Sequence, residues 1–410
     1  MRHVIVGRGP AGVVAAETLR AHDRASEVLL IGDEPGPAYS RMAIPYLLAR
    51  QIREEGTWLR HDTTHFERQR VGQLETRVEA LNAESKTLAL ANGTTLDYDR
   101  LLLATGSSPV DPPIEGVDLP RVHHCWTLED AHHIMESAEA GSRVVLMGAG
   151  FIGCIIMEAL KLRGVRLTVV EAGDRMVPRM MDQVAGNLIK QWCIDQGIEV
   201  CTSTRITRIE PGDEGLWLHC EPGEPMQADL VVVATGVRPN VGFLQESGVE
   251  IGNGIRVDAH QRSSVDDVYA AGDVCEGASW QGGRGVHAIQ PMAVETARVA
   301  ALNMVGREAT HVGSLDMNVL DTLGLISVSY GQWMGVEGGD SASLLDERSG
   351  RYVKLRFDGD HLIGGITLGI TEHVGALRGL IQSRRHLGVW KKHLMENPTR
   401  FMEAWVSTVP

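Results

Sequence analysis

The fold is decided by the stretch Arg143-Val-Val-Leu-Met-Gly148-Ala-Gly150-Phe-Ile-Gly153. The apolar residues before Gly148 predict a buried strand, and the residues after Gly153 predict a helix as far as Leu162. Gly148 allows a tight turn, Gly150 leaves the backbone bare enough for a pyrophosphate, and Gly153 allows the helix to pack closely on the strand. A second apolar run, Leu167-Thr-Val-Val, ends at Glu171. This order of strand, turn, helix, strand and acid predicts a dinucleotide site, formed by Gly148, Gly150, Phe151, Ile152, Gly153 and Glu171.

The same order of signals occurs at the N-terminus, in His3-Val-Ile-Val-Gly7-Arg-Gly9-Pro-Ala-Gly12 and then Val28-Leu-Leu-Ile-Gly-Asp33-Glu34. Its expected nucleotide contacts are Gly7, Gly9, Pro10, Ala11, Gly12 and one of the two acids, Asp33 or Glu34. The extra Gly32 leaves the choice between these acids open. Two nucleotides in one chain indicate a flavin and a nicotinamide, with one nucleotide fold inserted into the other.

Composition limits the remaining possibilities. The chain has 410 residues, which is enough for two or three domains, and it is 43% hydrophobic and 22% charged. A formal net charge of −14 argues against a general nucleic-acid binder. The six cysteines form no Cys-x-x-Cys pair, so we expect no structural disulfide, zinc site or other metal site. No apolar run is long enough for a membrane span, and the first strand leaves no room for a signal peptide, so we expect a cytoplasmic protein.

The order of these signals resembles the pyridine nucleotide-disulfide oxidoreductase superfamily, over residues 1 to about 310. Within it, the chain is most similar to the branch of NADH oxidases, coenzyme A disulfide reductases, flavin domains of NADH-dependent nitrite reductases, and rubredoxin or ferredoxin reductases. The resemblance implies an α/β fold with FAD and NAD(H) as cofactors. It implies two Rossmann-like three-layer ββα domains, one inserted in the other, and a small α+β C-terminal domain. The expected ranges are 1–112 and 245–310 for FAD, 113–244 for NAD(H), and 311–410 for the C-terminal interface domain.

Three further motifs follow the family order. Ala-Thr105-Gly106 and Ala-Thr235-Gly236 each follow a buried strand, where the resemblance implies that the chain crosses close to a nucleotide. Gly272-Asp273 follows a third strand, and in this family its carboxylate accepts a hydrogen bond from the flavin ribityl chain. A helix is expected after His287 and as far as Met304, with Gln290 near the flavin. Its N-terminus could stabilise negative charge on a reduced flavin ring, and His287 could donate a proton.

The segment Tyr39-Ser-Arg41-Met42-Ala-Ile-Pro45-Tyr46 departs from the family pattern. Met42 stands where the oxidases and coenzyme A disulfide reductases have a redox cysteine. Tyr46 stands where the ferredoxin and rubredoxin reductases have a lysine near the flavin. A thioether cannot act as a thiolate nucleophile, so electrons would leave directly from the flavin. Arg41 is a candidate for a flavin phosphate, and Tyr46 could pack near the flavin ring.

Glu158 matches the family glutamate near the contact between nicotinamide and flavin, but its usual lysine partner is missing. Either Glu158 contacts the nicotinamide amide directly, or Arg50 or another cation replaces the lysine. We therefore take Glu158 and Tyr46 as the candidate catalytic residues. Glu171 is placed to bind a ribose 2′-hydroxyl and to repel a 2′-phosphate, which favours NAD over NADP. Arg175 and Arg179 could soften this preference.

The C-terminal part contains an expected hairpin, Arg351-Tyr-Val-Lys-Leu-Arg-Phe and His361-Leu-Ile-Gly-Gly-Ile-Thr-Leu, joined by Asp358-Gly359-Asp360. A helix is expected from about Glu372. The tail after Ser383 is locally basic, and it is either a solvated helix face or a docking surface for an acidic redox partner.

The leading hypothesis is an FAD-dependent NADH oxidoreductase that exchanges electrons with a protein carrier and uses no redox-active cysteine. The resemblance suggests a rubredoxin, a ferredoxin or iron-sulfur subunits of a larger complex as the partner, and a homodimer is a further expectation. The chain also resembles NAD-coupling subunits of 2-oxoacid acceptor oxidoreductases of the phenylglyoxylate dehydrogenase type. The alternatives are an NADH oxidase that uses oxygen and a non-catalytic NADH-sensing flavoprotein.

Overall fold

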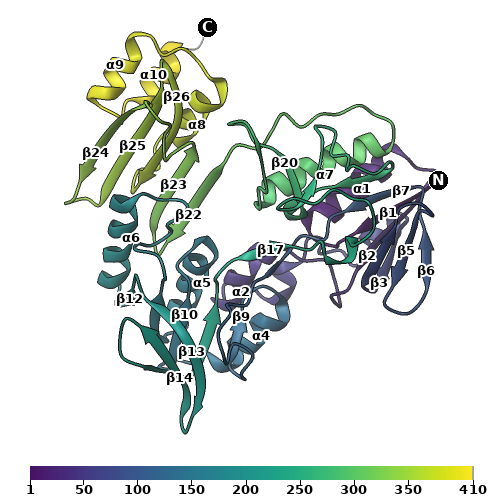
Figure 1. Cartoon of the computed structure of the whole chain (residues 1–410), viewed down its shortest axis with the longest axis horizontal. Coiled ribbons are helices and arrows are strands. Elements are labelled where there is room, and N and C mark those ends of the chain that lie inside the picture. The colour runs from purple at the N-terminus through teal and green to yellow at the C-terminus, as the bar shows by residue number, and fades with distance from the viewer. Residues whose placement is uncertain (409–410) are drawn as a thin grey trace. The chain divides into compact units, whose positions relative to one another are not determined.

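The computed structural model describes residues 1–408, and the chain divides into two compact units. Unit 1 consists of Met1–Leu47, Ile52–Ser108 and Val237–Ser314. Unit 2 consists of Leu48–Gln51, Pro109–Gly236 and Leu315–Pro410. Each unit thus combines segments that are far apart in the sequence, as the colours in Figure 1 show. The three expected domain ranges remain a prediction.

Unit 1 is built on a sheet with the strand order β19-β7-β1-β2-β3, all of whose neighbours pair in parallel. The strands of the unit are β1 (Arg2–Val6), β2 (Glu27–Gly32), β3 (Val71–Glu75), β4 (Val78–Asn82), β5 (Thr87–Leu90), β6 (Thr95–Asp97), β7 (Arg100–Leu103), β18 (Ile255–Arg256), β19 (Val268–Ala270), β20 (Cys275–Ala278) and β21 (Arg284–Gly285). The helices are α1 (Pro10–His22), η1 (Arg41–Ala43), α2 (Ile44–Leu48), η2 (Glu54–Thr57), α3 (His65–Arg68), η3 (Gly242–Leu244), η4 (Gly272–Val274) and α7 (Gln290–Met304). A short ladder of β8 (Ser107–Pro109) and β17 (Val237–Pro239) lies where the chain leaves and re-enters the unit.

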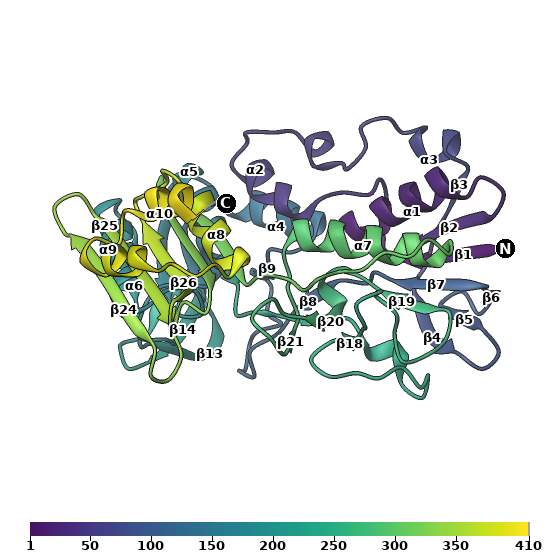
Figure 2. The same cartoon turned by 90° about the horizontal axis from the view of Figure 1, so that it is seen from above.

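The sheet of unit 1 is covered on both faces because its strands are apolar on both faces. In β1, Ile5 belongs to the core under helices α1 and α7, whereas Val4 and Val6 belong to the core on the opposite face. That second core includes side chains of the small antiparallel sheet β4-β5-β6. Figure 2 shows α1 and α7 side by side over the sheet. These are the three layers, helices, parallel sheet and second sheet, that the sequence predicts.

Unit 2 contains a second nucleotide-type fold with the strand order β12-β11-β10-β16-β9. Its strands are β9 (Val122–His124), β10 (Arg143–Met147), β11 (Arg166–Val170), β12 (Glu199–Cys201), β13 (Arg205–Gly212), β14 (Gly215–Glu221), β15 (Met226–Ala228) and β16 (Leu230–Val233). Its helices are α4 (Leu128–Ser137), α5 (Phe151–Leu162) and α6 (Gln183–Asp195). The antiparallel sheet β13-β14-β15 covers one face of the parallel sheet through a shared apolar core. The second Rossmann-like fold expected from the sequence is therefore confirmed, as is the mixed α/β class.

The C-terminal part of unit 2 is an antiparallel sheet with the order β22-β23-β26-β25-β24. Its strands are β22 (Met317–Thr322), β23 (Leu325–Gly331), β24 (Asp340–Asp346), β25 (Arg351–Asp358) and β26 (His361–Leu368), and its helices are α8 (Val374–Ser383), α9 (Val389–Glu396) and α10 (Phe401–Thr408). Strands β25 and β26 form the predicted hairpin, closed by the pair Asp358 and His361. The expected helix begins at Val374, two residues after its predicted start at Glu372.

Asp182 ties this sheet to the second nucleotide fold. Its side chain caps α6 by accepting a hydrogen bond of 3.0 Å from the Ala185 N–H. It also accepts one of 2.8 Å from the Tyr352 hydroxyl and one of 2.7 Å from the Lys354 ammonium. Burial would raise the pKa of this carboxyl, but Lys354 and the two other donors hold the pKa below its usual value. The charged form of Asp182 therefore stabilises both α6 and its contact with β25.

We expect Asp182→Ala to lower the free energy of unfolding by about 1–3 kcal/mol. The substitution removes the cap of α6 and also the carboxylate that accepts hydrogen bonds from Tyr352 and Lys354. Tyr352→Phe removes one of these hydrogen bonds and should cost at most about 1.5 kcal/mol. Urea unfolding of the two variants measures both values. A loss for Asp182→Ala no greater than that for Tyr352→Phe would contradict this role.

His3 is a buried histidine in β1, with 0% of its surface exposed. Burial lowers the pKa of His3, and this outweighs the opposing effect of Asp23, 3.4 Å away. The unfolded chain therefore binds a proton at His3 more readily than the folded chain does. At a pH above the unfolded pKa of about 6.5, His3 does not lower the free energy of unfolding. As the pH drops below this value, protonation of His3 in the unfolded chain lowers the free energy of unfolding. We expect His3→Gln to reduce the loss of unfolding free energy between pH 7 and 5, measured by urea unfolding at each pH. An unchanged pH dependence would contradict this assignment.

Candidate functional site

The first glycine turn brings two backbone segments into direct contact. Gly7 has a φ of +116°, and a Cβ atom there would lie 2.0 Å from the carbonyl oxygen of Ala104. A Cβ on Gly12 would lie 1.8 Å from the carbonyl oxygen of Gly7. No side chain fits at either position, so helix α1 can approach β1 and β7 this closely only with glycine. Pro10 and Ala11 form the first turn of the helix.

The second turn repeats this construction. Gly148 has a φ of +103°, and its Cβ would lie 2.6 Å from the carbonyl oxygen of Ala234. A Cβ on Gly153 would lie 2.2 Å from the carbonyl oxygen of Gly148. Phe151 and Ile152 begin helix α5. The roles expected for the first and third glycines, a tight turn and close packing, are thus visible in both units.

The middle glycine of each turn faces open space. A Cβ on Gly9 or Gly150 would have nothing within 4 Å, and the same is true of Gly106 and Gly236 beside the turns. Gly9 and Gly150 are also the N-cap residues of α1 and α5, and neither helix has a side-chain cap. A bare backbone beside an uncapped helix N-terminus fits an anionic pyrophosphate, because the helix dipole and the terminal N–H groups favour negative charge. Both turns therefore have the shape and polarity that FAD and NAD(H) require.

The threonines at the strand exits hold the backbone in place. The Thr105 hydroxyl donates to the Asn240 carbonyl oxygen at 3.0 Å, and the Asn240 amide donates back to the Thr105 carbonyl oxygen at 2.9 Å. In unit 2 the Thr235 hydroxyl donates to the Val110 carbonyl oxygen at 2.9 Å. Each threonine thus fixes the crossing point of the chain beside an open glycine.

The acids at the strand ends have different partners. Glu171 accepts hydrogen bonds from the N–H of Ala149 at 2.7 Å and of Gly173 at 2.6 Å, so its carboxylate lies on the glycine turn itself. In unit 1, Asp33 pairs with Arg77 at 3.1 Å. The Glu34 carboxylate instead accepts from Tyr39 and Arg41. Arg41 is thus held by an acid at the end of β2, and the choice between Asp33 and Glu34 stays open.

Arg175 is committed to its own loop. Its guanidinium donates to the carbonyl oxygens of Met181 at 2.9 Å and Pro178 at 3.2 Å, and to Asp174 at 2.7 Å. Arg179 is exposed. Of the two arginines expected to soften a preference for NAD, Arg175 has a structural role in this arrangement.

The Gly272-Asp273 motif lies at the start of η4, packed on helix α7. The Gly272 N–H donates to the Thr296 hydroxyl at 3.1 Å. Burial raises the pKa of Asp273, against the opposing effects of the Ser107 hydroxyl at 3.3 Å and of Arg41. Gln290 begins α7 and accepts a hydrogen bond from the Ser40 hydroxyl at 2.8 Å. Four predicted site residues of unit 1, Arg41, Gly272, Asp273 and Gln290, therefore belong to one connected region.

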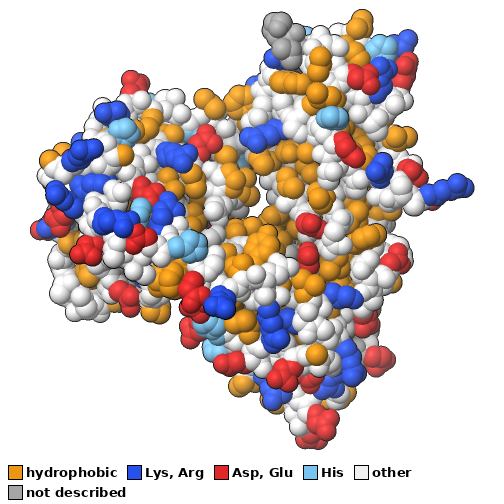
Figure 3. Space-filling model, turned by 180° about the vertical axis from the view of Figure 1, so that it is seen from behind, with side chains coloured by type: hydrophobic (Ala, Val, Ile, Leu, Met, Phe, Trp, Pro, Cys, Tyr) orange, Lys and Arg blue, Asp and Glu red, His pale blue; other side chains and the backbone are white. Residues whose placement is uncertain are grey.

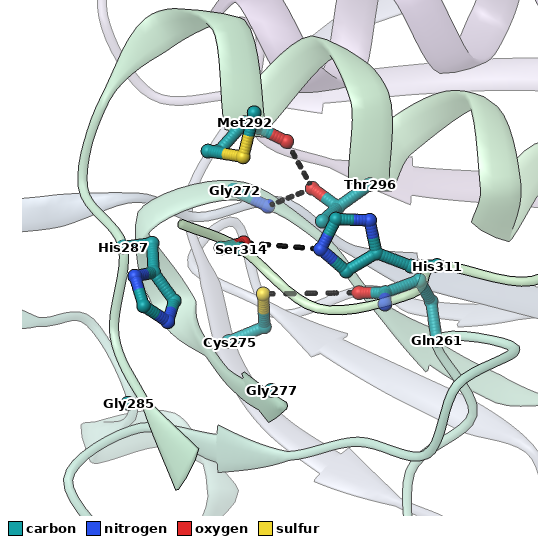
Figure 4. A pocket seen from close by; sticks show the side chains of 10 residues that line it. All are labelled: Gln261, Gly272, Cys275, Gly277, Gly285, His287, Met292, Thr296, His311 and Ser314. Carbon is teal, nitrogen blue, oxygen red and sulfur yellow. Dashed lines mark hydrogen bonds between the residues drawn. The ribbon is translucent and has the colours of Figure 1, made fainter. Parts of the chain in front are cut away.

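A small cavity lies behind this motif (Figure 4). His287 lines it opposite His311, whose ring contacts the Ser314 hydroxyl at 3.0 Å, while Cys275 contacts Gln261 at 3.9 Å. The enclosed space is about 10 Å³, which is room for about one water molecule. His287 thus faces a cavity the size of one water molecule. His311 and Cys275 carried no signal in the sequence that would have placed them here.

The segment before and within α2 exposes two large side chains. Met42 is 47% exposed and Tyr46 is 55% exposed, so neither is a core residue of the described chain. All six cysteines are free, and burial raises the pKa of each of them. A thiolate is therefore disfavoured at every cysteine of the chain.

The charged neighbour of Glu158 is an acid, Asp321. Burial and the nearby Asp321 raise the pKa of Glu158, and the N–H of Leu323 opposes this by stabilising the charged form. Arg50 acts on a different group: together with burial, it lowers the pKa of Arg163. Asp321 and Leu323 follow Glu158 by more than 160 residues, so no local pattern in the sequence could have linked them.

The basic C-terminal tail is largely paired within its own domain. Lys391 pairs with Asp340 at 2.7 Å, Lys392 lies 3.9 Å from Glu396, and Arg400 pairs with Glu403. The Arg385 guanidinium lies over the Trp405 ring. Figure 3 shows acidic and basic side chains interspersed over the face it presents. These pairs favour the solvated helix face over the docking surface for the tail.

Residues 1–408 contain no helix that is long and apolar enough to cross a membrane. In the same residues, no group of three or more His, Cys, Asp or Glu side chains is arranged to hold a metal ion.

Comparisons with known proteins agree with this geometry. The family model described as pyridine nucleotide-disulphide oxidoreductase matches residues 1–301. The chain is 32% identical to the epsilon subunit of NADH-dependent phenylglyoxylate dehydrogenase of Aromatoleum evansii, covering 97% of this chain and 95% of that subunit. It is 31% identical to the ferredoxin–NAD(+) reductase component of the anthranilate 1,2-dioxygenase system of Burkholderia cepacia, covering 92% and 93%. The structure of an NAD-dependent persulfide reductase from A. fulgidus, 27% identical, matches with a TM-score of 0.88 over 95% of this chain and 78% of that chain.

The glycine turns predict two different effects of an added methyl group. Gly150→Ala should leave the free energy of unfolding unchanged but weaken NAD⁺ binding at least about tenfold, because the methyl occupies space needed by the pyrophosphate. Gly153→Ala should destabilise the protein by about 1–3 kcal/mol, because its Cβ meets the backbone. Urea unfolding and calorimetric titration with NAD⁺ measure both quantities.

Gly375→Ala is a matched control, since a Cβ there would also meet nothing within 4 Å. It should change neither stability nor NAD⁺ affinity by more than about 0.5 kcal/mol. Unchanged NAD⁺ affinity in Gly150→Ala would contradict the assignment of this turn.

Proposed function

Because the chain belongs to the pyridine nucleotide-disulphide oxidoreductase family, whose members bind FAD and NAD(H), we propose that it passes electrons between NAD(H) and an iron-sulfur protein, directly through the flavin. The chain is thus an FAD-dependent NADH oxidoreductase. What we propose is the path of its electrons, through the flavin without a thiol, and the protein that exchanges electrons with it. The partner would be a ferredoxin-like carrier or an iron-sulfur subunit of a larger complex.

The absence of a usable thiol carries the proposal. By its resemblance to the family, the sequence has Met42 where relatives have a redox cysteine, and a thioether has no proton to lose. Every cysteine of the chain has its pKa raised by burial, so none replaces the missing thiolate. A disulfide or sulfenate relay therefore has no residue to act on, and electrons must pass from the flavin without a sulfur intermediate.

The name of one relative supports a ferredoxin-like partner, and the name of another supports a place in a larger complex. One is a reductase component that acts on ferredoxin, and the other is a subunit of an NADH-dependent dehydrogenase. Both match the chain over more than nine-tenths of its length, including the C-terminal sheet.

The bound cofactors would supply hydride transfer between nicotinamide and flavin. The protein would bind and orient them. Gly9 and Gly150 leave room for the two pyrophosphates, with Pro10, Ala11, Phe151 and Ile152 at the helix starts beside them. Glu171 would bind the NAD ribose, and Asp33 or Glu34 the FAD ribose. Asp273 would hold the ribityl chain with Gln290 nearby, Arg41 would bind a flavin phosphate, and Thr105 and Thr235 would fix the crossing strands.

Two side chains would act at the reacting end. Glu158 would orient the nicotinamide amide, and Tyr46, which is largely exposed in unit 1, would pack on the flavin ring. Exact orientation matters because hydride transfer depends on the distance and alignment of the two rings.

Alkylation tests the sulfur-free route. NADH-reduced holoenzyme treated with iodoacetamide should keep its full rate of electron transfer to a [2Fe–2S] ferredoxin, because no thiol takes part. Met42→Cys is the matched positive control, since it places an exposed thiol at the family position and should be modified. Loss of most of the parent enzyme's activity after alkylation would contradict the proposed route.

To identify the electron acceptor, stopped-flow measurements compare the rates at which ferredoxin and oxygen reoxidise the NADH-reduced flavin. We expect ferredoxin to reoxidise it faster than air-saturated buffer does. Faster reoxidation by oxygen would instead favour an NADH oxidase. Failure of NADH to bleach the flavin without oxygen would favour a non-catalytic NADH sensor.

A further inference from the structure

The hairpin turn between β22 and β23 has an unusual residue. Thr322 pairs with Leu325, which leaves Leu323 and Gly324 as a two-residue loop. Both have positive φ values, +54° and +86°. Two-residue hairpin loops with two positive φ angles favour Asn, Asp or Gly at the first position, and a leucine in the left-handed conformation is strained. Such strain persists where surrounding contacts require it, which directs attention to what Leu323 contacts.

Contacts from two helices hold the peptide groups on both sides of Leu323. The Trp192 indole N–H, on α6, donates to the Leu323 carbonyl oxygen at 3.2 Å. The Leu323 N–H stabilises the charged form of the Glu158 carboxylate, on α5. The turn is also closed internally, because the Gly324 N–H donates to Asp321 at 2.7 Å. The left-handed conformation is therefore the one that directs the carbonyl group of Leu323 to α6 and its N–H to α5.

The other groups around Glu158 do not hold its carboxylate, so its orientation depends on the contact with this turn. One helical turn before it on α5, Cys154 is 0% exposed, and Thr322 on β22 is likewise 0% exposed. The cations on α5 and α6 have other partners: Lys161 donates to the Gln196 carbonyl oxygen and Lys190 to the Thr202 hydroxyl. Asp321, the charged group that acts on Glu158, repels it. The Leu323 N–H is thus the attractive contact that opposes this repulsion.

We propose that Trp192 and Leu323 are positioning residues that orient Glu158 for nicotinamide binding. Trp192 fixes the carbonyl group of Leu323, the fixed turn directs the Leu323 N–H at Glu158, and the carboxylate is held in the absence of the family's lysine. This inference rests on the proposed role of Glu158. It adds that the C-terminal sheet supplies part of the nicotinamide half-site through a backbone group.

Trp192→Phe tests the first step, because it removes the indole N–H and keeps an aromatic side chain. We expect anaerobic flavin reduction by NADH to slow about two- to tenfold, the usual effect of losing one hydrogen bond. Trp217→Phe is the matched control: Trp217 is a half-buried tryptophan on β14, and its substitution should leave the rate unchanged. An unchanged rate in Trp192→Phe would overturn the proposal.

A double-mutant cycle with Glu158→Gln separates positioning from general stability. If Trp192 acts through Glu158, Trp192→Phe should have little further effect on flavin reduction in the Glu158→Gln protein. Equal losses in both backgrounds would overturn the coupling through Leu323. An unchanged rate in Glu158→Gln alone would instead overturn the role of Glu158 in the proposed function, so the two failures are distinguishable.

Hydrogen exchange provides a readout that does not depend on activity. In the parent protein the Leu323 amide should exchange more slowly than the amide of Asn92, an exposed residue in the turn between β5 and β6. Trp192→Phe should speed exchange of the peptide that contains residues 321–324, and Trp217→Phe should not. Equal exchange at Leu323 and Asn92 in the parent would overturn the proposal, even if Trp192→Phe folded poorly.

Discussion

The structure depends on backbone contacting backbone at four glycines. At Gly7, Gly12, Gly148 and Gly153, a Cβ atom would lie between 1.8 and 2.6 Å from a carbonyl oxygen of a neighbouring segment. These contacts bring each helix N-terminus directly over the end of its strand. Only then do the open positions at Gly9 and Gly150 lie beside an uncapped helix dipole. The same four contacts therefore determine both the packing of the two nucleotide folds and the places where anions can bind.

The parts of the fold that could be predicted from the sequence are those that local patterns specify. Glycine spacing after a buried strand located both turns, and the start of α5 follows directly from it. The hairpin of β25 and β26 was predictable because Asp358-Gly359-Asp360 is a strong turn signal between alternating strands. The strand exits at Thr105 and Thr235 were predictable from their order along the chain, although their hydrogen-bond partners, Asn240 and Val110, were not.

What could not be predicted depends on contacts between segments far apart in the sequence. Leu323 reads as an ordinary apolar residue, and only the structure shows that it is left-handed and held by Trp192. Nothing in the sequence indicates that the Asp182 carboxylate accepts a hydrogen bond from Lys354 in addition to capping α6. The basic tail had two interpretations from the sequence, and its ion pairs, which only the structure shows, favour the solvated helix face. Such contacts leave no periodic or spacing signal that a single sequence could show.

We propose that electrons enter and leave through the flavin alone, with no sulfur group that stores a pair of them. Anaerobic titration of the holoenzyme with NADH measures this storage capacity directly. One NADH delivers two electrons, which is the full capacity of one FAD, so one equivalent of NADH per FAD should complete the bleaching of the flavin. A requirement for two equivalents would show a second two-electron acceptor in the protein and would contradict a route through the flavin alone.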